Sequence, residues 1–194
     1  MATVKVTEQK VILCGEYGVG KTSIFRRFAN NTFVASNDRK STLGLDNIDK
    51  EYVIEDRRIR SVTPIYYNFA EAAILVFALD NSTSFHLLSQ HLLDIVTYAE
   101  NAKIFLCGNK SDLENVAPQV TDAEMEQFCE QCHNLISGIY KTSCKTGEGV
   151  NEMFEDIAQH LVEANRSRME LHEMDKDRFK ISYVDEATDP SCLC

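Results

Sequence analysis

The feature that most constrains this chain is a glycine-rich loop near its start, where residues 15–22 read GEYGVGKT. This segment fits the pattern G-x-x-x-x-G-K-[ST], which marks a phosphate-binding P-loop when a strand precedes it and a helix follows it. Residues 10–14 (KVILC) predict a buried strand that enters the loop, and residues 22–29 predict a helix that leaves it. A glycine-rich turn followed by a chance Lys-Thr pair is the alternative, and the strand–loop–helix context disfavours it.

Each part of this loop has a physical role. The glycines let backbone N–H groups turn inward, which makes a concave anion site at a helix N-terminus. Lys21 can reach the β- and γ-phosphates of a nucleotide, and the Thr22 hydroxyl can ligate Mg²⁺. The residues expected to bind phosphate are Gly15, Tyr17, Gly18, Val19, Gly20, Lys21, Thr22 and Ser23.

A second motif follows the apolar run at residues 104–107, where residues 109–112 read NKSD. A strand that ends in N-K-x-D is the guanine reader of the GTPase families. The Asp112 carboxylate can accept two hydrogen bonds, from the ring N–H and the exocyclic amine of guanine, and adenine lacks this pair of donors. Asn109 can bond the other side of the ring and tie this loop to the P-loop, while the stem of Lys110 can lie flat over the base.

A third segment, TSCK at residues 142–145, comes after a short predicted strand at residues 139–140. It resembles the T-S-A-K segment of the same families, in which a backbone N–H meets the carbonyl oxygen of guanine. Cys144 stands where alanine is usual, and a backbone donor survives that change. By this resemblance Ser143, Cys144 and Lys145 belong to the guanine site.

With these three motifs in order, the chain resembles a Rab-type small GTPase of the Ras superfamily over residues 8–165 and its last three residues. Residues 41–46 (STLGLD) are similar to the Rab effector loop, and residues 79–85 (LDNSTSF) also match the family. The resemblance implies that GTP or GDP and Mg²⁺ are the cofactors. It also implies that Thr42 ligates Mg²⁺ beside Thr22 and senses the γ-phosphate, and that Phe33 packs against the guanine.

One segment of the family pattern is missing. Rab-type chains carry a strand that ends in W-D-T-A-G-Q-E shortly before a Tyr-Tyr pair, which here is Tyr66-Tyr67, but about a dozen residues are absent before it. No D-x-x-G sequence occurs from Asp46 to Asp80. In the family this Asp holds the Mg²⁺ shell, the Gly N–H meets the γ-phosphate, and a following Gln orients the attacking water. We therefore assign no catalytic residue and expect hydrolysis and switching to be impaired.

The side chain of Tyr17 also departs from the family, because Ras and Rab P-loops carry a small residue at this point. A phenol ring here would crowd the γ-phosphate and any incoming arginine finger, which argues for slow hydrolysis. The alternative is a tyrosine that faces the surface without consequence.

The alternation of strands and helices predicts an α/β fold of the P-loop NTPase class, with a doubly wound, mostly parallel sheet flanked by helices. One central strand is expected to be missing or truncated, because it would come from the absent segment. The region 48–62 then either covers the edge of the first strand or leaves that edge exposed. We expect helices over residues 82–100, 121–136 and 150–165.

The composition fits one cytosolic globular domain, with 194 residues of which 44% are hydrophobic. A net charge of −10 argues against nucleic acid as a partner, and we expect a monomer. No run approaches the about 18 apolar residues of a membrane span, and the first residues lack a signal-peptide core. Residues 129–133 (CEQCH) formally match a haem-attachment motif, but they lie in a helix capped at Thr121, so structural thiols are favoured.

The domain is predicted to end at residue 165 and to be followed by a flexible tail over residues 166–194. The terminal Cys-Leu-Cys does not fit C-a-a-X and is similar to the C-x-C ending of Rab proteins, which takes a geranylgeranyl group on each cysteine. Two such chains are what stable membrane anchoring requires. The resemblance thus implies a lipid anchor at Cys192 and Cys194 and a peripheral place on the cytosolic face of membranes. Two free tail thiols are the alternative.

These observations predict a Rab-like GTP/GDP-binding protein that acts in vesicle trafficking or signalling, with impaired switching. Its expected partners are the prenylation and membrane-extraction machinery, exchange factors and effectors. The alternative is a non-switching interaction protein, a splice or truncated form, that holds no nucleotide. A P-loop kinase or ATPase is a third possibility, and the NKSD motif speaks against it.

Overall fold

The computed structural model describes residues 9–34, 50–54, 57–61, 67, 69–113, 119–133 and 135–178. The expectations for Thr42, Tyr66, Cys192 and Cys194 lie outside these residues. The chain divides into two units, residues 1–161 and residues 162–194.

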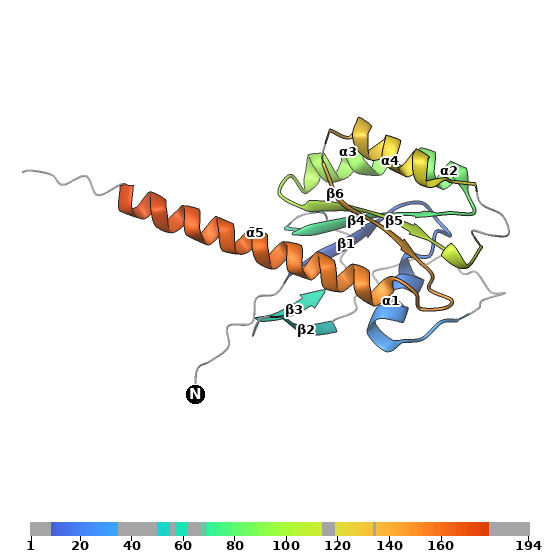
Figure 1. Ribbon diagram of the computed structural model, residues 1–194, viewed down its shortest axis with the longest axis horizontal. Coiled ribbons are helices and arrows are strands. Elements are labelled where there is room, and N and C mark those ends of the chain that lie inside the picture. The colour runs from blue at the N-terminus through green and yellow to red at the C-terminus, as the bar shows by residue number, and fades with distance from the viewer. Residues whose placement is uncertain are drawn as a thin grey trace, which may run out of the picture. The chain divides into compact units, whose positions relative to one another are not determined.

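Strands and helices alternate along the first unit, and the last helix continues beyond it (Figure 1). In chain order the elements are β1 (Val11–Cys14), α1 (Lys21–Asn30), β2 (Lys50–Ile54), β3 (Arg57–Ser61), β4 (Ala72–Ala78), α2 (Ser82–His86), α3 (Leu88–Tyr98), β5 (Lys103–Asn109), a 3₁₀ turn (Ser111–Leu113), α4 (Asp122–Gln131), β6 (Ile136–Thr142) and α5 (Val150–Arg178).

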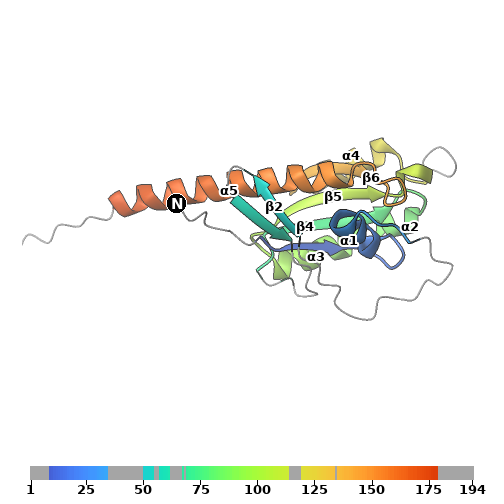
Figure 2. The same ribbon diagram turned by 90° about the horizontal axis from the view of Figure 1, so that it is seen from below.

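The main sheet is parallel and has the strand order β1-β4-β5-β6, which Figure 2 shows. In the first ladder Val11 pairs with Ala72, and the register continues to Cys14 opposite Leu75. Every residue of β4 is buried, because it lies inside the sheet and both of its faces are covered. The predicted α/β fold with a parallel sheet flanked by helices is confirmed.

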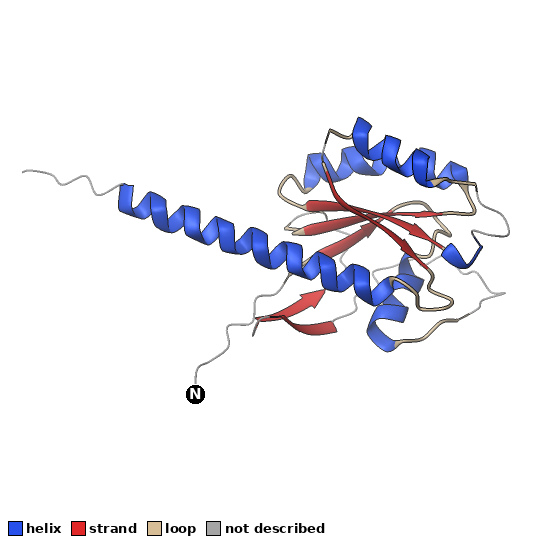
Figure 3. Cartoon of the chain, viewed as in Figure 1, coloured by secondary structure: helices blue, strands red, loops and turns tan. Residues whose placement is uncertain are grey.

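Helices cover both faces of this sheet (Figure 3). Successive side chains of a strand point to opposite faces, so alternate residues of β4 enter two different cores. Ile74 and Val76 pack in one core with apolar residues of α1 and α5, whereas Leu75 and Phe77 pack in the other with residues of α2, α3 and α4. The carboxyl ends of the strands, which carry the three sequence motifs, therefore meet at one edge of the sheet.

The strands β2 and β3 pair antiparallel with each other, from Lys50 opposite Ser61 to Ile54 opposite Arg57, and form a separate two-stranded sheet. Among the described strands, β1 pairs with β4 alone. The family strand that the sequence lacks is thus not replaced by β2 or β3 in the main sheet.

The helix expected over residues 82–100 is interrupted. Leu87 lies between α2 and α3, and its N–H bonds to the carbonyl oxygens of Thr83 and Phe85. Phe85 and Leu88, which lie on either side of the break, are buried in the same core. The helical period of the sequence did not reveal this interruption, because apolar residues recur on both sides of it.

The helix expected over residues 121–136 is too long. The predicted cap at Thr121 is present, but α4 ends at Gln131 and His133 adopts a left-handed φ of 48°. Leu135, which falls within the expected helix, is 48% exposed and lies outside α4. The strand β6 begins at Ile136, earlier than the predicted strand at 139–140.

Helix α5 (Val150–Arg178) continues past residue 165, where the sequence predicted the domain to end. The first part of the expected flexible tail is therefore helical. Residues 150–178 contain neither glycine nor proline and are rich in strong helix formers, which explains the extension. Within the part of the chain that the structure describes, no helix has both the length and the apolar composition needed to cross a membrane.

Candidate functional site

The P-loop holds a backbone conformation that requires glycine at two positions. Gly15 has a φ of +144°, and a Cβ atom there would lie 2.0 Å from the carbonyl oxygen of Val76 in β4. Gly20 has a φ of +102°, and its Cβ would lie 2.3 Å from the side-chain nitrogen of Asn109. Such distances leave no room for a side chain. The backbone of the loop therefore packs directly against β4 and the NKSD segment.

Lys21 begins α1 and folds back over the loop. Its ammonium donates hydrogen bonds of 2.7 Å to the carbonyl oxygen of Gly15 and 2.8 Å to that of Glu16. Burial lowers the pKa of Lys21, and the nearby Glu16 carboxylate offsets part of that effect. An anion bound at the loop would favour the charged form, so this lysine fits a phosphate site.

Asn109 joins the three motifs. Its side chain is 2% exposed, and its amide donates a 2.7 Å hydrogen bond to the carbonyl oxygen of Val19 in the P-loop. Its side-chain oxygen accepts from the Thr142 hydroxyl and the Cys144 thiol, each at 3.3 Å. The predicted tie between the NKSD segment and the P-loop is therefore present.

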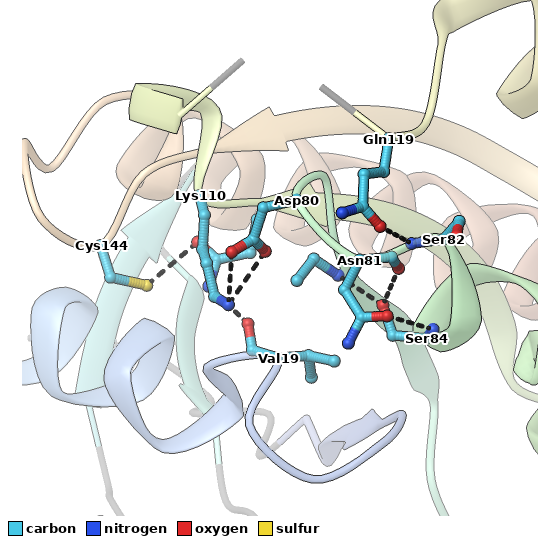
Figure 4. Close-up of polar contacts among 10 residues, drawn as sticks. Val19, Asp80, Asn81, Ser82, Ser84, Lys110, Gln119 and Cys144 are labelled. Atoms are coloured by element: carbon cyan, nitrogen blue, oxygen red, sulfur yellow. Dashed lines mark hydrogen bonds and ion pairs between the residues drawn. The ribbon is translucent and has the colours of Figure 1, made fainter. Parts of the chain in front are cut away.

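The thiol of Cys144 is a donor in this arrangement. Burial raises the pKa of Cys144 to about 11, so the group keeps its proton at neutral pH. Figure 4 shows Cys144 and Val19 approaching this junction from different loops. Cysteine in place of alanine thus adds a hydrogen bond to the side chain of Asn109 that alanine cannot make.

The Asp112 carboxylate is fixed by the neighbouring loop. One of its oxygens accepts a 2.7 Å hydrogen bond from the Ser143 hydroxyl, and the other lies 3.6 Å from the Lys145 ammonium. The Ser143 hydroxyl also accepts from the N–H of Thr146 at 3.2 Å. The structure therefore brings together Asp112, Ser143 and Lys145, which the sequence assigned to the guanine site.

Lys110 has a partner that sequence reasoning missed. Its ammonium donates to both carboxylate oxygens of Asp80, at 3.0 and 3.3 Å, and the two side chains lie together in Figure 4. Lys110 itself has a left-handed φ of 68°. Asp80 directly precedes Asn81, whose side chain caps α2 by accepting from the N–H of Ser84. The matching segment LDNSTSF was the available signal, since it placed an acidic residue at the end of β4.

Arg27 is a second residue that sequence reasoning did not single out. It lies in the last turn of α1 and donates to the carbonyl oxygens of Cys144 and Lys145, at 2.8 and 2.9 Å. These partners are 117 and 118 positions away in the chain, so no local pattern indicates the contact.

Other predicted residues are not brought into this cluster. Tyr17 is 63% exposed at the P-loop, and Phe33 is 39% exposed after α1. Glu16, a P-loop residue that the sequence did not assign to the site, contacts α3, where its carboxylate lies 3.0 Å from a ring nitrogen of His91. No group of three or more His, Cys, Asp or Glu residues suited to a metal ion occurs within the described ranges.

A comparison with known families identifies the family of the chain. The model of the Ras family matches residues 10–163. The chain belongs to the Ras family. This Ras-family chain is 30% identical over 209 aligned positions to the Ypt/Rab-type GTPase ypt7 of Schizosaccharomyces pombe, covering 95% of its own length and 96% of the relative's. It is also 32% identical to the GTP-binding protein ypt4 of Schizosaccharomyces pombe, over 86% of the chain and 75% of ypt4. The identity is 29% to the Ras-like GTP-binding protein RYL2 of Yarrowia lipolytica, over 96% of the chain and 98% of RYL2.

The lengths of these alignments show that the relatives carry residues that this chain lacks. Those with ypt7 and RYL2 extend over 209 and 207 positions, although this Rab-like GTPase has 194 residues. Each alignment therefore contains positions of the relative that have no counterpart here. Within the aligned regions, the chain therefore lacks internal residues that these relatives have.

Proposed function

We propose that this Rab-like GTPase binds GDP and GTP with Mg²⁺, and that its γ-phosphate switch and its hydrolysis are impaired. The observation that carries nucleotide binding is the junction at Asn109. Because its amide holds Val19 while its oxygen accepts from Thr142 and Cys144, the phosphate and base loops are already joined. In a preorganised site of this kind, little conformational entropy is lost when a ligand binds.

In this proposal, the residues of each part of the site are those assigned from the sequence. Phosphate is bound by Gly15, Tyr17, Gly18, Val19, Gly20, Lys21, Thr22 and Ser23. Guanine is bound by Phe33, Asn109, Lys110, Asp112, Ser143, Cys144 and Lys145.

The Mg²⁺ ligands from the chain would be the hydroxyls of Thr22 and Thr42. Mg²⁺ commonly keeps several waters and binds substrate phosphates, so it does not need a carboxylate cluster. This donor set is consistent with the lack of such a cluster among the residues described. When bound, the ion would neutralise phosphate charge.

The impairment follows from the absence of D-x-x-G between Asp46 and Asp80. A backbone N–H that meets the γ-phosphate and a Gln that orients water are both lost with that segment. The long alignments with ypt7 and RYL2 support a real shortening of the chain. Without that N–H contact to the γ-phosphate, the affinities for GTP and GDP should differ less than in a GTPase that carries D-x-x-G.

The proposal extends to the membrane. Cys192 and Cys194 would each carry a geranylgeranyl group, and the protein would act in vesicle trafficking or signalling on the cytosolic face. Its partners would then be the prenylation and membrane-extraction machinery, exchange factors and effectors.

Nucleotide content tests the proposal. The full chain is purified from a bacterial host in Mg²⁺ buffer and denatured, and the released nucleotides are identified by chromatography. We expect nearly one guanine nucleotide per protein, with GTP in excess of GDP because hydrolysis is slow. The matched variant Asp112→Ala should release far less, since it lacks the acceptor for guanine.

The rival function is a non-switching interaction protein that holds no nucleotide. The separate pairing of β2 with β3, outside the main sheet, favours it. A folded wild-type protein that releases no guanine nucleotide would support this rival and refute the binding proposal. A protein rich in GDP with rapid turnover of added GTP would refute only the impairment.

A further inference from the structure

We propose that Arg27 is a positioning residue for guanine recognition, because it holds the backbone of the loop at residues 142–145 from the side opposite Asp112. The inference rests on the proposed binding of guanine nucleotide. It adds a residue of α1 to a site whose polar base-reading groups come from the loops after β5 and β6.

The guanidinium of Arg27 uses all three of its nitrogens. Nε donates to the carbonyl oxygen of Cys144 at 2.8 Å, and Nη2 donates to that of Lys145 at 2.9 Å. Nη1 donates to the backbone oxygen and the side-chain oxygen of Asn31, both at 3.1 Å. The planar fork of arginine can hold two consecutive carbonyls in this way, whereas the single ammonium of lysine cannot match its geometry.

Peptide geometry gives these contacts a directional consequence. In a planar trans peptide the C=O and the N–H point in opposite directions. When Arg27 holds the carbonyls of Cys144 and Lys145, the N–H groups of Lys145 and Thr146 therefore point away from it. On the side of the loop that faces away from Arg27, the N–H of Thr146 donates to the Ser143 hydroxyl.

That far side is also the side of Asp112, because Ser143 donates its hydroxyl to the Asp112 carboxylate. Within the described residues, the N–H of Lys145 donates to no other backbone carbonyl. This N–H remains available to an acceptor on the base. Arg27 thus holds the loop in the orientation that turns the N–H of Lys145 toward the residue expected to read guanine.

The test separates the carbonyl oxygen of guanine from its exocyclic amine. Affinities for GDP, 6-thio-GDP and IDP are measured by competition with a fluorescent nucleotide. Sulfur is a weak acceptor, so 6-thio-GDP reports on the N–H donor of Lys145, while IDP lacks the amine that Asp112 reads. The variants are Arg27→Lys, Arg27→Gln and Asn31→Gly, with Arg26→Gln as a control on an exposed position of the same helix.

We expect Arg27→Lys and Arg27→Gln to bind GDP about tenfold more weakly, the change typical of one well-aligned hydrogen bond. Their preference for GDP over 6-thio-GDP should shrink by the same factor, while their preference for GDP over IDP stays as in the wild type. Asn31→Gly keeps the guanidinium and the left-handed backbone, so it should show a smaller loss in the same direction. Arg26→Gln should resemble the wild type.

An equal loss of affinity for all three nucleotides would show that Arg27 acts on stability alone and would overturn the inference. Unchanged preferences in the Arg27 variants would overturn it too. If those variants fail to fold, an unchanged ratio in Asn31→Gly decides against it. A wild-type protein that binds no guanine nucleotide refutes the proposed function and this inference together, whereas wild-type binding with unaffected variants refutes only the inference.

Discussion

The side-chain amide of Asn109 donates a 2.7 Å hydrogen bond to the carbonyl oxygen of Val19, across 90 positions of the chain. The same side chain accepts hydrogen bonds from Thr142 and Cys144. One buried amide therefore connects the P-loop to both segments that are expected to bind the base. Its replacement should disturb all of them together.

Asn109→Asp is expected to destabilise the protein by about 3 kcal/mol, because a buried carboxylate would face the Val19 carbonyl with no proton to donate. Equilibrium unfolding in urea measures this change. The exposed Asn151→Asp at the start of α5 is the control and should leave stability nearly unchanged. Equal effects of the two substitutions would contradict a special role for the Asn109 amide.

Asp112→Asn should change the preferred base. Replacing the carboxylate with an amide removes two charge-assisted acceptors for guanine, so GDP affinity should fall by about 100-fold or more. The new amide N–H can instead donate to the 2-carbonyl of xanthine, so affinity for XDP should rise. Competition binding with both nucleotides measures the exchange. The exposed Asp94→Asn on α3 should retain the wild-type preference, and a wild-type preference in Asp112→Asn would exclude this residue as the base reader.

Gly20→Ala and Gly18→Ala form a matched pair in the P-loop. Both glycines have positive φ, +102° for Gly20 and +79° for Gly18, so either substitution costs roughly 1–2 kcal/mol in backbone strain. Only the Cβ at position 20 meets another group, the Asn109 amide at 2.3 Å, whereas the Cβ at position 18 meets open space. Chemical denaturation should therefore find Gly20→Ala the less stable of the two. Similar stabilities would mean that the loop shifts to accommodate the Cβ at position 20 with no loss in the free energy of unfolding.

Alkaline pH should weaken the fold through Cys107. Burial raises the pKa of Cys107 to about 12, from 9.0 for an exposed thiol. Between these values the folded protein keeps the thiol proton while the unfolded chain loses it, so the free energy of unfolding falls as pH rises above 9. Cys107→Ala should lower stability at every pH because it removes buried volume, but it should also flatten the decline above pH 9.

The diagnostic result is a smaller decline in the free energy of unfolding of Cys107→Ala above pH 9. Denaturant titrations at several pH values measure it. Cys129→Ala is the comparison, because burial raises the pKa of Cys129 only to about 11. Parallel pH curves for wild type and Cys107→Ala would show that other groups, such as Cys14 or Tyr67, dominate the alkaline loss.

The sequence predicted the sheet and the three motif loops because these depend on local patterns. Buried apolar runs mark β1, β4 and β5, and parallel strands bring their carboxyl ends to one edge. The joining role of Asn109 was predictable for the same reason. The motif fixes both the residue type and its position at the end of β5.

The features that escaped prediction depend on distant or subtle contacts. Arg27 contacts carbonyls more than 100 positions away, and backbone carbonyls carry no side-chain signature. The strand β6 was underestimated because residues 136–142 mix Ile and Tyr with Gly, Ser and Lys, and most of them are only half-buried. The break at Leu87 left no trace in a continuous helical pattern.

The pairing of β1 has a consequence for how the P-loop opens. Among the described strands, the one that leads into the P-loop is held by a single ladder, to β4. Detaching it requires the loss of one set of strand hydrogen bonds, so its amides should exchange with solvent deuterium sooner than those of β4 or β5. A nucleotide that bridges the P-loop and the loop after β5 would then act as a clasp across β1, β4 and β5. Slower exchange in β1 on adding ligand would be the earliest sign that the clasp has closed.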